Sequence, residues 1–117
     1  MKKWNGWGDD QNNFNFELSR SALGFLQQQI GTAKPLPDAT LAEVLAKVPA
    51  SRLQPHPLVS LDTEQRLRHA RGQSLPDWLA MRSGEFGVFP DAVAFPKSSA
   101  EVQSLLQYAE QQGIAVI

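Results

Sequence analysis

The sequence contains no cysteine, almost no net charge and no long apolar run, and each absence excludes a class of protein. Without cysteine there is no disulfide, no thiolate zinc site and no cysteine nucleophile. Eleven basic and twelve acidic residues give a formal charge of −1, so no broad nucleic-acid-binding surface is indicated. No apolar run approaches the ~20 residues that span a bilayer. We therefore expect a soluble, cytoplasmic protein with no nucleic-acid partner and no transmembrane segment.

The length and composition fit one ordinary folded domain. The chain has 117 residues, of which 42% are hydrophobic and 20% are charged, and these values are typical of globular proteins. The two histidines, His56 and His69, are thirteen positions apart and have no carboxylates at a fixed ligand spacing. Such a pattern does not match a metal-ligand set, and no metal site is predicted.

The chain begins with an aromatic arm. Trp4, Trp7, Phe14 and Phe16 alternate with glycine, asparagine and aspartate. Aromatic side chains at this density predict that the arm docks on a surface, in a later part of the protein or on a partner. A ligand-stacking platform built from Trp4 and Trp7 is the alternative, and we favour docking.

Helical periodicity and capping residues predict short helices between residues 21 and 83. The expected segments are 21–30, 40–48, 62–70 and 74–83. Thr40 and Glu43 fit a capping box at the start of the second segment. The buried side of the last helix is predicted to consist of Leu75, Trp78 and Leu79.

The last segment predicts a βαβ unit. Residues 92–95 and 114–117 are short apolar runs, and the helix between them begins with a capping box of Ser98 and Glu101. This helix carries an apolar stripe that is predicted to be core: Val102, Leu105, Leu106 and Ala109. The two strands of such a unit are parallel, with a right-handed crossover. Because two strands under one helix are not a stable sheet, we expect that the sheet continues and that the chain is truncated at Ile117.

These elements together predict an α+β fold with two parts. Residues 1–88 form the arm and the short-helix region, which is mostly helical. Residues 89–117 form the first βαβ unit of a larger α/β domain.

Three motifs in this order resemble a known family. They are residues 4–8 (WNGWG), 68–74 (RHARGQS) and 90–96 (PDAVAFP). The chain resembles FAD-linked oxidases of the vanillyl-alcohol-oxidase type. The first motif, followed by PLPDATLAEVL at 35–45, is similar to the alkyldihydroxyacetonephosphate synthase branch. The resemblance implies that residues 89–117 open a PCMH-type FAD-binding domain. In that family a Pro-x-Gly-Gly-Gly-Thr-Ser loop follows the strand at 114–117 and holds the FAD pyrophosphate through backbone amides.

The resemblance also implies a function for the parent protein. It would be a non-covalent FAD enzyme, an oxidoreductase or an alkyl transferase, and the nearest branch replaces an acyl group by a fatty alcohol to form an ether lipid precursor. Two alternatives are an FAD-dependent 2-hydroxy-acid dehydrogenase of the D-lactate type and a small helical protein-interaction module. The piece itself is expected to be structural and inactive, with no FAD bound. Its partners would be the remainder of the parent chain, around a lipid-like substrate, or a second copy at an exposed sheet edge.

Four polar residues are candidates for chemistry, and each has a structural alternative. His69 has a polar context suited to a general base, but it also lies where a histidine favours a helix C-terminus. Arg66, Arg68 and Arg71 form a possible phosphate grip, but Asp62, Glu64 and Asp77 nearby favour a solvated or ion-paired helix face. We favour the structural interpretation for all four, and His56 is interpreted as a linker residue. No catalytic or cofactor-binding residue is assigned.

Overall fold

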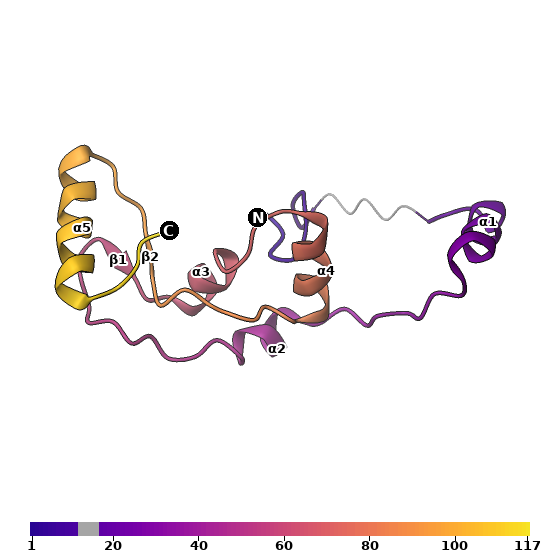
Figure 1. The fold of residues 1–117 in the computed structure, drawn as a ribbon, viewed down its shortest axis with the longest axis horizontal. Coiled ribbons are helices and arrows are strands. Elements are labelled where there is room, and N and C mark those ends of the chain that lie inside the picture. The colour runs from indigo at the N-terminus through magenta and orange to yellow at the C-terminus, as the bar shows by residue number, and fades with distance from the viewer. Residues whose placement is uncertain (12–16) are drawn as a thin grey trace.

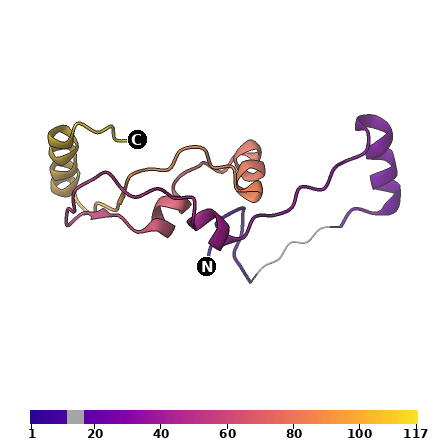
Figure 2. The same ribbon diagram turned by 90° about the horizontal axis from the view of Figure 1, so that it is seen from below.

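The computed structural model describes residues 1–11 and 17–117. Its long axis measures 58 Å and the other two measure 25 Å each (Figure 1). The radius of gyration is 18.8 Å, whereas a compact domain of this length has a value of about 13 Å. The chain is therefore extended, with helices α1 (Arg20–Ile30) and α5 (Ser99–Gln112) at opposite ends (Figures 1 and 2).

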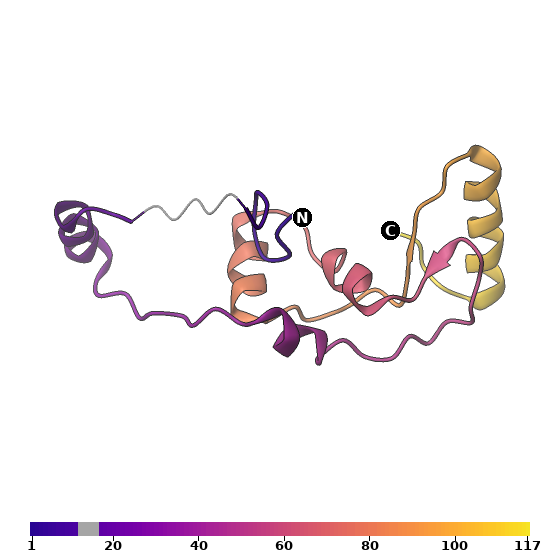
Figure 3. The same cartoon turned by 180° about the vertical axis from the view of Figure 1, so that it is seen from behind.

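Short elements connect these two ends. Between them lie α2 (Leu41–Leu45), β1 (Val59–Ser60), α3 (Thr63–Arg68), α4 (Leu75–Ser83) and β2 (Val93–Ala94). The described part of the chain is thus mostly helical with one small sheet, which confirms the α+β class. Figure 3 shows from behind how long connecting segments run along the body between these elements.

Capping side chains determine where the helices begin. The predicted capping box of Thr40 and Glu43 is present at α2, and Ser74 forms the same reciprocal arrangement with Asp77 at α4. Asp62 accepts a hydrogen bond from the Gln65 backbone N–H at the start of α3. These contacts satisfy amides that a helix leaves without an intrahelical partner.

The predicted capping box at α5 is only half correct. Ser98 accepts a hydrogen bond from the Glu101 N–H, as predicted. The Glu101 carboxylate, however, accepts from the N–H of Lys97, one residue before the N-cap. The extended backbone of Ser98, with φ −149° and ψ 161°, accompanies this shift of the partner by one residue.

A small core joins α2, α3 and α4. Val44, Leu67 and Met81 meet Phe86 from the segment after α4, and all four are buried. Trp78 is half-buried against this cluster, but Leu75 and Leu79 are exposed, so the predicted buried side of α4 is wrong for those two residues. The buried side runs through Trp78 and Met81 because the core and the N-terminal arm both meet the helix there.

The sheet is antiparallel, which corrects the predicted βαβ unit. Val59 pairs with Ala94 and Ser60 pairs with Val93. Residues 114–117 form no strand: after α5 the chain turns at Gly113, which has φ 65°, and the N–H of Ile114 returns to the carbonyl of Ala109. An apolar run becomes a strand only where another strand offers hydrogen bonds, and the described part of the chain offers β2 a partner in β1 instead.

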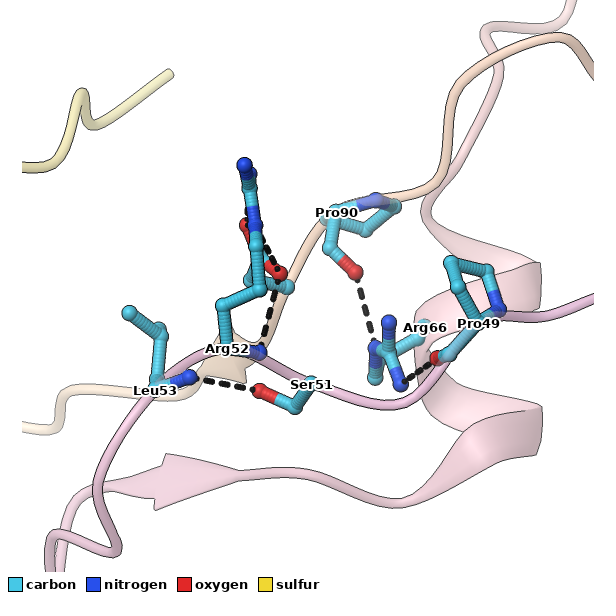
Figure 4. Close-up of polar contacts among 7 residues, drawn as sticks. Pro49, Ser51, Arg52, Leu53, Arg66 and Pro90 are labelled. Carbon is cyan, nitrogen blue, oxygen red and sulfur yellow. Dashed lines mark hydrogen bonds and ion pairs between the residues drawn. The ribbon is translucent and has the colours of Figure 1, made fainter.

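Arg66 connects the core to the segment that leads into β2. Only 2% of its surface is exposed. Its Nε donates to the carbonyl of Pro90 and its Nη1 donates to the carbonyl of Pro49, both at 2.8 Å (Figure 4). The predicted solvated or ion-paired surface position is therefore wrong for Arg66, because its guanidinium is enclosed between two carbonyl groups.

An ion pair joins the same two segments at the surface. Arg52 donates from Nε to both carboxylate oxygens of Asp91, at 3.0 and 3.1 Å, and its backbone N–H also donates to Asp91. The Arg52 side chain, through these hydrogen bonds, lowers the pKa of Asp91 below its ordinary value, and burial acts in the opposite direction. Arg66 and this pair together fasten the segment 49–52 to the segment 90–91 (Figure 4).

Replacement of Arg66 by Met is expected to lower the free energy of unfolding by about 2–4 kcal/mol, because two charge-assisted hydrogen bonds are lost in a buried site. Urea denaturation followed by circular dichroism measures this change. Arg20→Ala, which removes an exposed arginine on α1, is the matched control and should change the value by less than about 0.5 kcal/mol. Equal effects of the two substitutions would contradict the role given to Arg66.

Replacement of Asp91 by Asn is expected to destabilise the chain only where the carboxylate is charged. A carboxyl with a lowered pKa in the folded state stabilises the fold above its unfolded pKa, and this contribution is lost as the pH falls through the folded value. The gap between the urea midpoints of the unmodified chain and the variant should be full above pH 3.8, the ordinary value, and should close below it. A gap that persists unchanged in strong acid, or one equal to that of the exposed control Glu17→Gln, would argue against the ion pair.

Candidate functional site

Arg68 and Arg71, the two other arginines of the predicted phosphate grip, donate hydrogen bonds to other groups of this chain. Arg68 donates from Nε to Glu64 at 2.8 Å, and from Nη1 to the carbonyl of Lys2 at 2.7 Å. Arg71 donates from Nε to the carbonyl of Phe86 at 2.9 Å. The guanidinium of Arg71 also contacts Asp77 at 3.3 Å. The ion-paired interpretation describes these two arginines, and their donors are directed at the chain's own oxygens.

Contacts with Ser74 and Arg71 also affect the pKa of Asp77. The hydroxyl of Ser74 lowers the pKa of Asp77, and Arg71 acts in the same direction with a smaller effect. Asp77 therefore stays ionised at neutral pH and serves both the cap of α4 and the ion pair. The residue has no catalytic partner among these contacts, and its role is structural.

The rings of His69 and His56 each form a hydrogen bond with a nearby backbone group. The Nδ1 of His69 lies 2.8 Å from the carbonyl of Gln65, and its ring meets the ring of Phe95 edge-on with centroids 5.5 Å apart. His69 is also the C-cap residue of α3, as the structural alternative proposed. The Nδ1 of His56 accepts from the N–H of Leu58 at 3.2 Å.

The linker around His56 is fixed to α5 by Tyr108. The hydroxyl of Tyr108 donates to the carbonyl of Gln54 at 2.6 Å, and its ring lies 4.6 Å from the ring of His56. Tyr108 is buried, as is Ala109 beside it. No local pattern predicts this contact, because the partners of Tyr108 are 52 and 54 positions away and lie in a proline-rich segment.

The N-terminal arm docks on this chain's own α4 and the segment after it. Residues 1–11 fold back on themselves, with Lys2 bridged to Asp9. Trp7 meets Trp78 edge-on with centroids 3.9 Å apart, and Trp4 stacks on Phe86 at 6.2 Å. Docking on a later part of the protein or on a partner was predicted, and the contacts lie within this chain, at Trp78, Phe86 and Arg68. Phe14 and Phe16, the other aromatics of the predicted arm, lie outside the described residues.

The apolar stripe of α5 is covered along one flank only. Tyr108 and Ala109 are buried and Leu105 is half-buried, but 44% of Val102 and 53% of Leu106 are exposed. Val102 and Leu106 are four residues apart and share one side of the helix. We call these two residues the outer face of α5. The prediction that the whole stripe is core is therefore wrong for the outer face.

The total exposed surface of the chain is also larger than that of a compact monomer of the same mass. The chain exposes 9064 Å². A compact monomer of 12.9 kDa exposes about 6,300 Å². The excess, roughly 2,700 Å², is comparable to the surface that a large, stable interface removes from water.

The described residues form neither a metal-binding cluster nor a membrane-spanning helix. Among residues 1–11 and 17–117, no cluster of three or more histidine and acidic side chains is arranged to hold a metal ion. Nor is any helix in that part of the chain both long and apolar enough to cross a membrane. A shallow hollow beside the sheet is lined by Pro57, Leu58, Val59, Ser60, Phe95, Lys97 and Glu101.

Comparisons of sequence and of structure match the chain to the same enzyme. No protein-family model matches the chain. It is 25% identical over 144 residues to alkyldihydroxyacetonephosphate synthase of Caenorhabditis elegans, a match that covers 98% of this chain and 24% of the relative. The chain thus spans about a quarter of the length of the curated relative that it matches.

Solved structures show the same likeness in the fold. Alkyldihydroxyacetonephosphate synthase in crystal form P1 matches 99% of this chain and 27% of its own length, with a TM-score of 0.61 and 23% identity. A second crystal form, P2₁2₁2₁, gives a TM-score of 0.60 at 23% identity and matches 26% of its own length. The resemblance predicted from the motifs is therefore confirmed: the chain is a distant homologue of alkyldihydroxyacetonephosphate synthase that corresponds to about a quarter of that protein.

Proposed function

We propose that residues 1–117 form the N-terminal part of an FAD-dependent enzyme that resembles alkyldihydroxyacetonephosphate synthase. In this proposal the parent enzyme makes an ether lipid precursor in the cytoplasm, and residues 1–117 have a structural role. The observation that supports it most directly is the homology, which extends over nearly the whole of this chain but over only a quarter of the relative. The name of the relative favours this activity over the alternative 2-hydroxy-acid dehydrogenase.

The large exposed surface and the extended shape of the chain support the same proposal. An excess of roughly 2,700 Å² of exposed surface and an uncovered outer face of α5 are expected of a segment that wraps around a larger body. A self-contained interaction module would bury its own apolar stripe and approach the radius of gyration of a compact domain. The extended shape therefore weighs against that alternative.

The residues of this chain do not fit FAD. In the family that the chain resembles, a Pro-x-Gly-Gly-Gly-Thr-Ser loop holds the pyrophosphate, and this sequence has no such loop, since no two of its eight glycines are adjacent. Arg66, Arg68 and Arg71 already donate to backbone carbonyls of the chain, and the remaining donor of Arg66, Nη2, is buried without an acceptor among the described residues. We therefore assign no chemical step to these residues, and we place cofactor and substrate binding in the remainder of the parent.

Within the parent, residues 89–117 would begin the FAD-binding domain. In the described part of the chain, β2 pairs along one edge with β1. The second edge of β2 and the outer face of α5 would be covered by strands and helices of the remainder. The sheet would then gain the additional strands that two short strands need for stability.

Titration of the 117-residue chain with FAD tests whether the cofactor site lies outside residues 1–117. We expect no saturable quenching of flavin fluorescence, because the chain lacks the glycine-rich loop that would hold the pyrophosphate. The heat-unfolded chain is the control for non-specific quenching. Tight binding with one FAD per chain would refute the proposal that the cofactor site lies elsewhere.

Substitution of the outer face of α5 tests the wrapping role. Val102→Ser with Leu106→Ser should change the free energy of unfolding of the isolated chain by no more than about 0.5 kcal/mol, since both side chains are exposed there. Tyr108→Phe on the opposite flank is the matched control, and it should cost about 1 kcal/mol because the hydrogen bond to Gln54 is lost.

The same pair of serines should prevent soluble accumulation of the complete parent enzyme, where the outer face of α5 would be buried. Urea denaturation of the isolated chain and fractionation of the parent measure the two effects. Normal folding of the parent with both serines would show that nothing covers this face.

A further inference from the structure

Helix α1 carries no buried residue, although its two ends are well defined. The hydroxyl of Ser19 accepts from the N–H of Ala22 at 3.2 Å, and the helix ends at Gly31, which has φ 83°. Figures 1 and 2 show α1 apart from the other elements. A helix of 11 residues is marginal in water without a tertiary contact, and Gly24 weakens it further. We therefore expect another surface to cover α1.

One side of α1 is apolar. Its members are Ala22, Leu23, Phe25, Leu26 and Ile30, with Gln29 the one polar residue among them. Successive residues of an α-helix are about 100° apart around the axis. Leu23, Leu26 and Ile30 therefore fall within about 60° of the circumference, and Phe25 widens the apolar arc to about 160°. We call this arc the apolar side of α1.

Charge is absent around the apolar side of α1. Residues 21–33 include no charged residue, and the opposite side of the helix carries Ser21, Gln27 and Gln28. A helix that lies on an anionic membrane has lysine or arginine along its polar side, whereas α1 has only Arg20, at its first position. A partner recognised by charge would need a charge to meet. The occupant that fits α1 is therefore a protein surface with an uncharged, apolar lining.

The α1 helix of a second copy is too small to be this surface. The exposed fractions are 45% for Leu23, 62% for Phe25, 38% for Leu26 and 79% for Ile30. Together they amount to little more than two whole side chains, on the order of 400 Å² at roughly 200 Å² each. A standard interface takes about 800 Å² from each partner. A pair of helices also meets along the narrow seam of Leu23, Leu26 and Ile30, which leaves Phe25 outside, whereas a groove contacts both flanks.

We propose that α1 lies in an apolar groove formed by the remainder of the parent enzyme, with Leu23, Leu26 and Ile30 as its anchors. Anchors at positions i, i+3 and i+7 are the usual pattern of a helix in a groove. Contact within one chain loses little translational freedom, so the small area of α1 suffices there although it falls short between separate molecules. About three quarters of the curated relative lies outside the match, which leaves ample chain to build the groove. The inference rests on the proposed function, because only a longer parent can supply the groove.

Amide hydrogen exchange followed by mass spectrometry tests the groove. In the isolated 117-residue chain the amides of residues 23–30 should exchange within seconds, because no other surface covers this helix. In the parent enzyme the same amides should exchange at least about tenfold more slowly. Leu26→Ser with Ile30→Ser should return the parent to the fast rate. Gln28→Ser, on the opposite side of α1, is the matched control and should leave the exchange slow.

The flavin absorbance of the purified parent distinguishes failure of the groove from failure of the proposed function. A parent that holds FAD and exchanges α1 as fast as the isolated chain would overturn the groove. Slow exchange in the isolated chain at high concentration would identify a second copy as the occupant, and slow exchange of the parent only with added phosphatidylserine vesicles would identify a lipid surface. Either of these results overturns the groove as well. Slow exchange in a parent without flavin would support the groove and refute the FAD-dependent activity.

Discussion

The arrangement of this chain depends on the two hydrogen bonds that the buried guanidinium of Arg66 donates. Arg66 lies on α3 and donates to the carbonyls of Pro49 and Pro90, so three segments distant in sequence meet at one side chain. Arginine suits this position because its planar fork presents several donors in fixed directions, whereas a lysine offers a single point charge. The rings of the two prolines fix φ, which removes one of the two backbone rotations that orient their carbonyl groups. Arg52 and Asp91 add a second connection between the same segments. The entry of the chain into β2, and hence its pairing with β1, follows from these contacts.

Away from Arg66 the molecule is held by a series of separate contacts. The core contains four buried side chains from α2, α3, α4 and the segment after α4. At one end α5 is attached through Tyr108 and the linker. Toward the other end the N-terminal arm contacts Trp78 and Phe86, and Asp38 pairs with Arg82. Each attachment is a hydrogen bond, an ion pair or a ring contact. An arrangement of this kind keeps its shape where a larger body supports it from one side.

Local features were predictable from the sequence, and long-range pairing was not. The helices and the caps at Thr40 and Ser74 depend on residues within four positions of one another, and the structure contains them. β1 was missed because two residues in a proline-rich linker show no alternating pattern. The run at 114–117 has the composition of a strand, but composition does not say which strand is its partner. The burial of Arg66 was missed for a similar reason, since a charged residue next to Glu64 and Asp62 has the local pattern of a helix surface.

The half-covered stripe of α5 and the extended shape have one physical explanation. A helix whose apolar stripe is wider than its local neighbours can cover keeps part of that stripe in water, at a cost of about 25 cal/mol for each Å² of apolar surface. Val102 and Leu106 remain exposed although Ala109 is buried and Leu105 is half-buried, and the chain as a whole exposes far more surface than a compact monomer of its mass. The likeness to much longer solved structures extends over 99% of the chain, including this uncovered helix. The extended arrangement is thus shared with proteins in which about three quarters of the chain lie outside the matched region.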